Sequence, residues 1–181
     1  RRPPGGTLAS VGSVTVRTAT TADAEQVAAI YNHEVLHSAA TFDLVPRTLE
    51  EQIEWIGART GAFQTIVAVD PGDPSGEVVG FGALSPYKER AAYRTSVEDS
   101  VYVRRDRNGE GIGSLLLATL LEGAATGGFH AVFARINTSG EASIALHRKS
   151  GFELVGIERE VGRKFNRWHD VALMEYLIPS T

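Results

Sequence analysis

The sequence contains no cysteine among its 181 residues. This absence excludes disulfide bonds, metal sites built from thiolates, and a cysteine nucleophile that would carry an acyl group. No run of about 18 apolar residues is present that would span a membrane. The first residues, Arg1–Thr7, also lack the apolar segment of a secretory signal. We therefore expect a cytoplasmic protein that has no membrane partner.

The chain also has little excess charge, because it contains 18 Lys and Arg and 22 Asp and Glu, which gives a formal net charge of −4. A nucleic-acid-binding surface needs a basic excess, so we expect no nucleic-acid partner. The length and the apolar fraction of 43% favour a single globular domain with a sizeable core. We expect residues 1–13 to form a flexible tail and residues 14–178 to form this domain.

The apolar pattern switches between the periods of strands and helices along the chain. It predicts strands at 14–18, 64–69, 78–84, 96–103, 131–136 and 171–177. It predicts helices that begin near Thr20 and Thr48, and further helices at 111–125 and 141–149. The turn at Pro71–Gly76 predicts that the two strands beside it form an antiparallel hairpin. The order β-αα-βββ-α-β-α-β implies an α/β protein with a mixed sheet and helices on both faces.

One segment is the most informative of the chain, because a predicted strand ends there in Arg104, Arg105 and Arg107 and is followed by three alternating glycines in Asn108–Ser114. Glycine permits positive φ, and backbone N–H groups at a helix start attract anions. The dinucleotide fingerprint is excluded because its third glycine position holds Leu116, and no Gly-Lys-Ser/Thr of a Walker loop follows. Two interpretations remain, a phosphate-binding loop and a glycine-rich turn with solvated arginines.

The motif Asn-Gly-Glu-Gly-Ile-Gly at Asn108–Gly113, about thirty residues before Ser143–Phe152, resembles the GNAT superfamily of N-acetyltransferases. A narrower resemblance is to phosphinothricin N-acetyltransferases and related amino-acid acetyltransferases. It rests on four blocks that occur in order: Tyr87–Tyr93, Ser96–Val103, His147 and Trp168–Val171. It covers roughly Val14 to Ile178.

The resemblance implies a GNAT fold with splayed central strands and acetyl-CoA as co-substrate, without a metal. It implies direct transfer of the acetyl group, in a ternary complex, to the primary amine of a small amino acid or analogue such as phosphinothricin or methionine sulfoximine. Relatives are commonly homodimers, so we expect one here. Two alternatives stay open: acetylation of a different small amine, and a non-catalytic module that only binds CoA.

The resemblance also assigns two catalytic residues. Glu98 stands where the family has the general base that deprotonates the amine, and His147 stands where the phosphinothricin branch has a histidine near the thiol leaving group. Without the resemblance, the sequence favours a Glu98 that faces solvent from a strand and a His147 that is a partly exposed helical residue. Nothing in the sequence indicates that the two side chains meet.

Residues for CoA follow from the same resemblance. The backbone of Val101, Tyr102 and Val103 would stabilise the oxyanion, and the remaining contacts are assigned to Asn108, Gly109, Glu110, Gly111, Ile112, Gly113, Ser114, Asn137 and Ser143. The chain departs from the family at Asn108, where Gln or Arg is usual, and at Gly140, where Asn is common. We expect Asn137 to replace the second of these contacts.

For the acceptor, the resemblance indicates Phe42, Lys88, Arg90 and Tyr93. Cationic side chains suit a substrate that carries a carboxylate. The alternative is that Phe42 only anchors its loop and that Lys88 and Arg90 are solvated. The Trp168–Asp170 segment lacks the companion His or Cys of a metal site, and we expect a turn there before the last strand.

Overall fold

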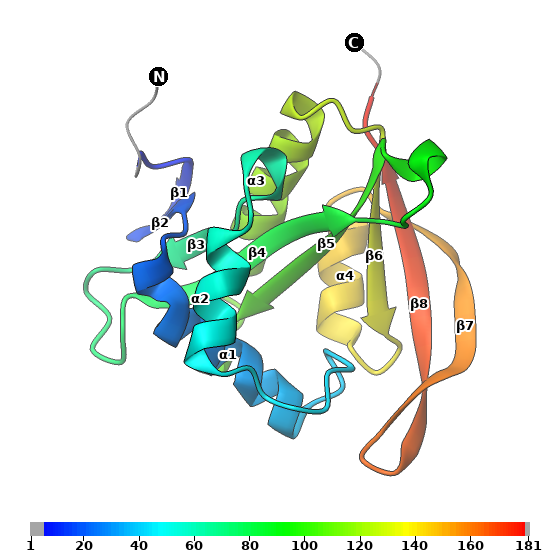
Figure 1. Ribbon diagram of the computed structural model, residues 1–181, viewed down its shortest axis with the longest axis horizontal. Helices are drawn as coiled ribbons and strands as arrows, with labels where there is room; N and C mark the ends of the chain where they lie inside the picture. Colours follow the sequence, from blue (N-terminus) through cyan, green and yellow to red (C-terminus); the bar gives the residue numbers. More distant parts are fainter. Residues whose placement is uncertain (1–5, 180–181) are drawn as a thin grey trace.

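The computed structural model describes residues 6–179, which form one eight-stranded sheet with helices on both faces (Figure 1). The elements of the first half are β1 (Ala9–Val11), β2 (Val14–Thr18), α1 (Ala24–His37), α2 (Leu49–Gly57), β3 (Ile66–Val69) and β4 (Val78–Pro86). Those of the second half are β5 (Ser96–Val103), α3 (Ile112–Thr126), β6 (Ala131–Asn137), α4 (Glu141–Lys149), β7 (Glu153–Lys164) and β8 (Arg167–Leu177). Short 3₁₀ turns occur at Thr21–Asp23, Gly61–Phe63, Ala91–Tyr93 and Arg105–Arg107.

The first two helices begin where the sequence predicts them. Thr48 accepts a hydrogen bond from the Glu51 N–H at 3.2 Å, and the Glu51 carboxylate accepts one from the Thr48 N–H at 2.8 Å. This capping box satisfies two of the N–H groups that a helix start leaves without partners. Thr20 and Asp23 form the same reciprocal arrangement before α1.

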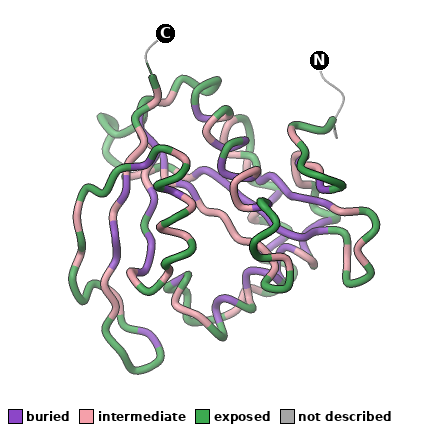
Figure 2. Tube along the Cα trace, turned by 180° about the vertical axis from the view of Figure 1, so that it is seen from behind, coloured by how far each residue is buried: buried purple, intermediate pink, exposed green. Residues whose placement is uncertain are grey.

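The sheet separates two apolar layers. Its order is β1-β2-β3-β4-β5-β6-β8-β7. On one face α3 and α4 bury Leu116, Leu117 and Phe152 against the strands, and on the other α1 and α2 pack over Phe81. In the tube of Figure 2, β3 and most of β4 and β6 are buried, β5 is largely half-buried, and β7 is exposed along most of its length. The half of the sheet formed by β6, β8 and β7 has no helix over it on the α1 side (Figure 1).

The central strands diverge, as the family resemblance implies. Strands β5 and β6 are the one parallel pair within residues 6–179, and they pair only at Ser96↔Ala131, Val97↔Val132 and Glu98↔Phe133. Beyond Glu98 the strand β5 continues to Val103 and β6 continues to Asn137 without a ladder between them. The facing edges therefore keep backbone groups that are free of sheet pairing.

Three expectations need correction. The N-terminal tail is not flexible throughout, because Ala9–Val11 forms β1 and pairs antiparallel with β2; residues 1–5 of that tail lie outside the described part. The predicted order omits the long strand β7. Trp168–Asp170 is not a turn but the start of β8, which continues through the predicted 171–177 strand. The remaining elements, the antiparallel β3–β4 hairpin included, agree with the prediction.

Candidate active site

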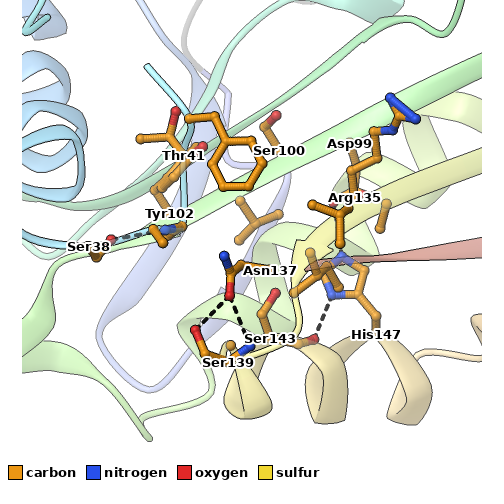
Figure 3. Close-up of a pocket in the computed structure, with 18 of the residues that line it drawn as sticks. Ser38, Thr41, Asp99, Ser100, Tyr102, Arg135, Asn137, Ser139, Ser143 and His147 are labelled. Carbon is orange, nitrogen blue, oxygen red and sulfur yellow. Dashed lines mark hydrogen bonds and ion pairs between the residues drawn. The ribbon is translucent and has the colours of Figure 1, made fainter. Parts of the chain in front are cut away.

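A pocket of about 680 Å³ lies where β5 and β6 diverge. Consecutive strand residues point to opposite faces of a sheet, and this pocket is lined by both Glu98 and Asp99. It therefore passes from the α1 face of the sheet to the α4 face through the opening between the strands. Figure 3 shows Asn137, Ser139 and Ser143 close together beside α4, with Thr41 on the other side of the pocket.

On the α4 face, His147 and Asp99 form a buried pair. Their exposed fractions are 3% and 7%, and Nε2 of His147 lies 3.1 Å from Oδ2 of Asp99. The other ring nitrogen, Nδ1, lies 2.7 Å from the carbonyl oxygen of Ser143, one turn earlier in α4. Both nitrogens thus face acceptors, which favours the imidazolium because only that form donates from both. Burial lowers the pKa of His147, but the hydrogen bond and the charge of Asp99 outweigh it and raise the pKa above its usual value.

On the other face of the sheet, Glu98 lines the same pocket. Burial raises the pKa of the Glu98 carboxyl above its usual value; the positive charge of Arg135 opposes this shift, and the negative charges of Asp99 and Glu158 add to it. Glu98 does not contact His147 in the described structure, where the imidazole bonds to Asp99 and Ser143 instead. The two predicted catalytic residues are therefore brought to one pocket but to different faces of the sheet.

Two polar atoms at this opening are buried and have no hydrogen-bond partner within the described residues. One is the acceptor Oδ1 of Asp99, and the other is the donor Nδ2 of Asn137. The Oδ1 atom of Asn137 accepts from the Ser139 N–H at 2.9 Å, which fixes the amide with its nitrogen free. Because an unmade buried hydrogen bond costs about 1–3 kcal/mol, both atoms indicate a site that receives polar groups of a ligand.

A loop covers the pocket on the α1 face. Ser38–Phe42, which follows α1, forms part of the pocket wall. Lys164, only 3% exposed, holds this loop, since its ammonium donates to the carbonyl of Thr41 at 2.8 Å and to that of Glu34 at 3.4 Å. Burial lowers the pKa of Lys164. The β7–β8 hairpin, which carries this lysine, is therefore tied to the loop.

Phe42 is the one predicted acceptor residue that the structure brings into the pocket lining. Its ring lies 5.9 Å from that of His169 and covers Gly162, where a Cβ atom would overlap the ring. Lys88, Arg90 and Tyr93 are not among the described residues of the lining. Lys88 lies over the rings of Tyr87 and Tyr93 instead.

This lysine and aromatic cluster nevertheless borders the site. Tyr87 stacks on Phe133 with ring centres 4.1 Å apart, and Phe133 is the register partner of Glu98 in β6. Lys88 and Tyr93 therefore lie beside the face that carries Glu98, outside the pocket itself.

The glycine loop lies next to α4, although it does not line this pocket. Gly111 caps α3 with φ +82°, a conformation that favours glycine, and no side chain caps the helix start. Leu115 is the first N–H that bonds back, to Gly111, so the N–H groups of Ile112, Gly113 and Ser114 lack helical acceptors. A Cβ on Gly113 would lie 3.2 Å from Leu146, so the start of α3 packs closely on the helix that carries His147.

The arginines before this loop do not form a free basic patch. Arg104 and Arg107 each donate to Asp73 at 2.6 Å, and Arg107 also pairs with Asp70 and Glu110. These bonds hold the pKa of Asp73 at about 2, chiefly through Arg104. Arg104 and Arg107 therefore fasten the β3–β4 turn to the loop.

No group of three or more His, Asp or Glu side chains within residues 6–179 is arranged to hold a metal ion. In the same range, none of the helices combines the length and the apolar character that crossing a membrane requires.

Several residues of the site were missed by the sequence analysis. They are Asp99, Arg135, Glu158, Lys164 and the loop residues Ser38 and Thr41. A signal was present for Asp99, because two consecutive acids in a strand cannot both face the same side. No local signal marks Lys164, which lies 123 residues from the loop it holds.

The chain is similar to known proteins both in sequence and in structure. The profile described as the acetyltransferase (GNAT) domain matches residues 16–173. A phosphinothricin N-acetyltransferase of Streptomyces coelicolor is 41% identical over 93% of this chain and 98% of its own length. An L-methionine sulfoximine/L-methionine sulfone acetyltransferase of Pseudomonas paraeruginosa is 37% identical over 93% of this chain and 97% of its own length.

Among solved structures, a GNAT superfamily phosphinothricin acetyltransferase from Sinorhizobium meliloti, in complex with acetyl-CoA, superimposes with a TM-score of 0.85 at 36% identity. The match covers 92% of this chain and 89% of that one. The fold and the diverging strands agree with the sequence similarity to two acetyltransferases, which extends over 93% of this chain. The chain is accordingly an enzyme of the GNAT acetyltransferase family.

Proposed function

We propose that this enzyme transfers the acetyl group of acetyl-CoA to the primary amine of a small amino acid or analogue, with phosphinothricin and methionine sulfoximine as the first candidates. The relatives with 41% and 37% identity carry these substrates in their names. The observation that carries the proposal is the pocket between β5 and β6, which has a half-buried carboxylate, Glu98, on one face and the buried His147–Asp99 pair on the other.

The start of α3 would hold the pyrophosphate of CoA. Its free N–H groups and the positive end of the helix dipole favour an anion at that point. Asn108, Gly109 and Glu110 complete the loop through their backbone. Because the neighbouring arginines are paired with acids, the backbone and not the side chains would supply most of this contact.

The opening between the strands would take the pantetheine arm. Nδ2 of Asn137 is a free buried donor for an amide carbonyl, and Asp99 Oδ1 is a free acceptor for an N–H group. Ser143 lies one helical turn before His147 and lines the same passage. These groups fit a ligand with alternating amide donors and acceptors.

Glu98 would act as the general base. An α-ammonium group has a pKa of about 7.7–8.0, so it must lose a proton before its nitrogen can attack the thioester carbonyl. The raised pKa of Glu98 brings the carboxylate closer to that of the amine, which makes it a better proton acceptor. Glu98 accepts one proton of the ammonium, the C–N bond forms, and the C–S bond breaks. The second proton that the nitrogen loses balances the proton that the thiolate takes up to leave as the CoA thiol.

His147 would assist the departing thiolate. A thiol has a pKa of about 8.5. Because both ring nitrogens of His147 face Asp99 and Ser143, the imidazolium would stabilise the thiolate by its charge, and donation of a proton to the sulfur would require one of these hydrogen bonds to break. Asp99 raises the pKa of this imidazole and so favours its charged form. The unpaired edge at Val101, Tyr102 and Val103 would offer backbone N–H groups to the oxyanion that develops during attack.

Phe42 would cover the acceptor side of the pocket from its loop. Lys88, Arg90 and Tyr93 would contact the acceptor from the border of the pocket. Phe42 has the firmest support of the four because it lines the pocket.

The test is an assay of CoA release with a panel of amines, together with the variant Glu98→Gln. We expect turnover with amino acids of the phosphinothricin and methionine sulfoximine type. The variant should lose about 10²-fold or more in kcat because proton abstraction is lost, while acetyl-CoA binding measured by calorimetry stays unchanged. Binding of acetyl-CoA without release for any amine would instead support a non-catalytic module.

A further inference from the structure

Two guanidinium groups belong to the described lining of the pocket, those of Arg105 and Arg135. Arg105 is held by a two-point ion pair, because its Nε and Nη2 atoms bind both oxygens of Glu34 at 2.8 and 2.7 Å. Glu34 is buried, so releasing Arg105 would leave an uncompensated charge inside the protein. Arg105 is therefore a structural cation.

Arg135 is held far more weakly. Its Nη2 atom donates to Glu158 Oε1 at 2.7 Å, one contact for a group that has five donors. The side chains of Arg135 and Glu158 are 39% and 35% exposed, and solvent makes such a pair easy to exchange. A carboxylate entering the pocket can therefore bind Arg135 at little cost.

The position of Arg135 matches the geometry of an amino acid. It lies two residues after Phe133, the register partner of Glu98, and so on the same face of the sheet, about 7 Å further along β6. The positive charge of Arg135 already acts on the Glu98 carboxyl. In an α-amino acid the ammonium and the carboxylate are attached to one carbon, so a base and a cation at this spacing can reach both.

We propose that Arg135 binds the α-carboxylate of the acceptor and selects amino acids over amines without a carboxylate, with Glu158 as its counter-ion in the empty site. This inference rests on the proposed function and adds a residue that decides the substrate class. Planar guanidinium groups suit this role because they bind a carboxylate through two parallel hydrogen bonds. Arg135 is a substrate-binding residue, and Glu158 is a positioning residue that competes with the substrate.

An opposite arrangement is conceivable on the same residues, in which Glu158 and Glu98 together attract an acceptor with two amino groups. The ion pair argues against it, because Arg135 neutralises Glu158 and His147 pairs with Asp99, so that Glu98 is the one carboxylate of the described pocket lining without an ion-pair partner. One carboxylate suffices for one ammonium.

The experiment compares matched acceptors, methionine sulfoximine and its α-carboxamide, in the wild type and in Arg135→Met. We expect the wild type to prefer the free acid in kcat/KM and the variant to lose about ten- to hundredfold on the acid alone, the range expected for a charged hydrogen-bonded contact. The loss should appear in KM with kcat changed little, since the contact exists before and during the reaction.

Two further variants sharpen the result. Glu158→Gln should lower KM for the acid by up to about fivefold, because it removes the competing partner of an exposed ion pair. Arg159→Met, an exposed arginine on β7 outside the pocket lining, is the matched control and should leave both acceptors unchanged.

Equal losses of Arg135→Met on the acid and on the carboxamide would overturn the inference, and so would a preference of the wild type for a linear diamine. Calorimetric binding of methionine sulfoximine to the wild type and to Arg135→Met tests the inference even without turnover, and equal affinities would also overturn it. Failure of the proposed function has a different signature, the absence of CoA release by the wild type with every amine.

Discussion

The buried pair of Asp99 and His147 predicts a stability difference that depends on pH. In Asp99→Asn the imidazole loses the anion that keeps it charged, while the shape of the side chain is preserved. The folded pKa of His147 is raised, so the pair stabilises the fold fully below the unfolded pKa of about 6.5, and this contribution disappears as the pH rises through the folded pKa.

The magnitude follows from burial. Removing one partner of a buried ion pair costs about 3–5 kcal/mol, and we expect the lower end, about 3 kcal/mol near pH 6, because the imidazole can release its proton. Above the folded pKa of His147 the histidine is neutral in both proteins, and the loss shrinks to that of an ordinary hydrogen bond, about 1 kcal/mol. For a chain of this length the melting temperature should fall by about 6–12 °C near pH 6 and by about 2–4 °C at a pH above that folded pKa.

Thermal unfolding at the two pH values measures this difference, and the same substitution in a His147→Gln background is the control. With His147 absent, Asp99→Asn should cost little at either pH, so the double-mutant cycle should show a coupling energy that is larger in acid. An equal loss at both pH values, or additive effects in the cycle, would refute the argument that Asp99 holds a charged imidazole.

Three further variants test the loop over the pocket and the glycine turn. Lys164→Met removes the donor to the Thr41 carbonyl. We expect KM for the acceptor to rise several-fold with unchanged acetyl-CoA affinity. Steady-state kinetics that show no change would contradict the argument that Lys164 holds the loop. Gly162→Val places atoms where the Phe42 ring lies, so acceptor KM should rise while calorimetry again shows normal acetyl-CoA binding. Gly111→Ala forces alanine into φ +82° and should lower the free energy of unfolding by about 1–2 kcal/mol in urea titrations, with weaker acetyl-CoA binding; a neutral result would mean that the turn relaxes.

Much of the fold could be predicted because its signals are local. Thr48 and Glu51 begin a helix through contacts three residues apart, and Gly127 and Gly128 end another. β7 was missed for a local reason as well. Its hairpin turns through Phe165 and Asn166, both with positive φ, and lacks the Asn-Gly pair that normally marks such a turn. Bulges between Leu154 and Gly156, and again before Gly162, also interrupt the alternation that would indicate a strand.

The site was predictable only in part. The resemblance supplied Glu98 and His147, and both line the pocket. Their relation to each other depends on strand parity and on the packing of α4, so the sequence could not indicate that His147 bonds to Asp99. The arginines near the glycine loop show the same limit, since their acidic partners at Asp70 and Asp73 lie more than 30 residues away.

Glu98 and Asp99 are adjacent in the chain but serve opposite sides of the sheet. In the proposed function, the amine is selected on the side of the sheet that carries Glu98, and the sulfur is handled on the side that carries Asp99 and His147. A substitution on the Glu98 face can therefore change which amine is accepted without altering the coenzyme side. The two faces communicate at the opening where β5 and β6 diverge.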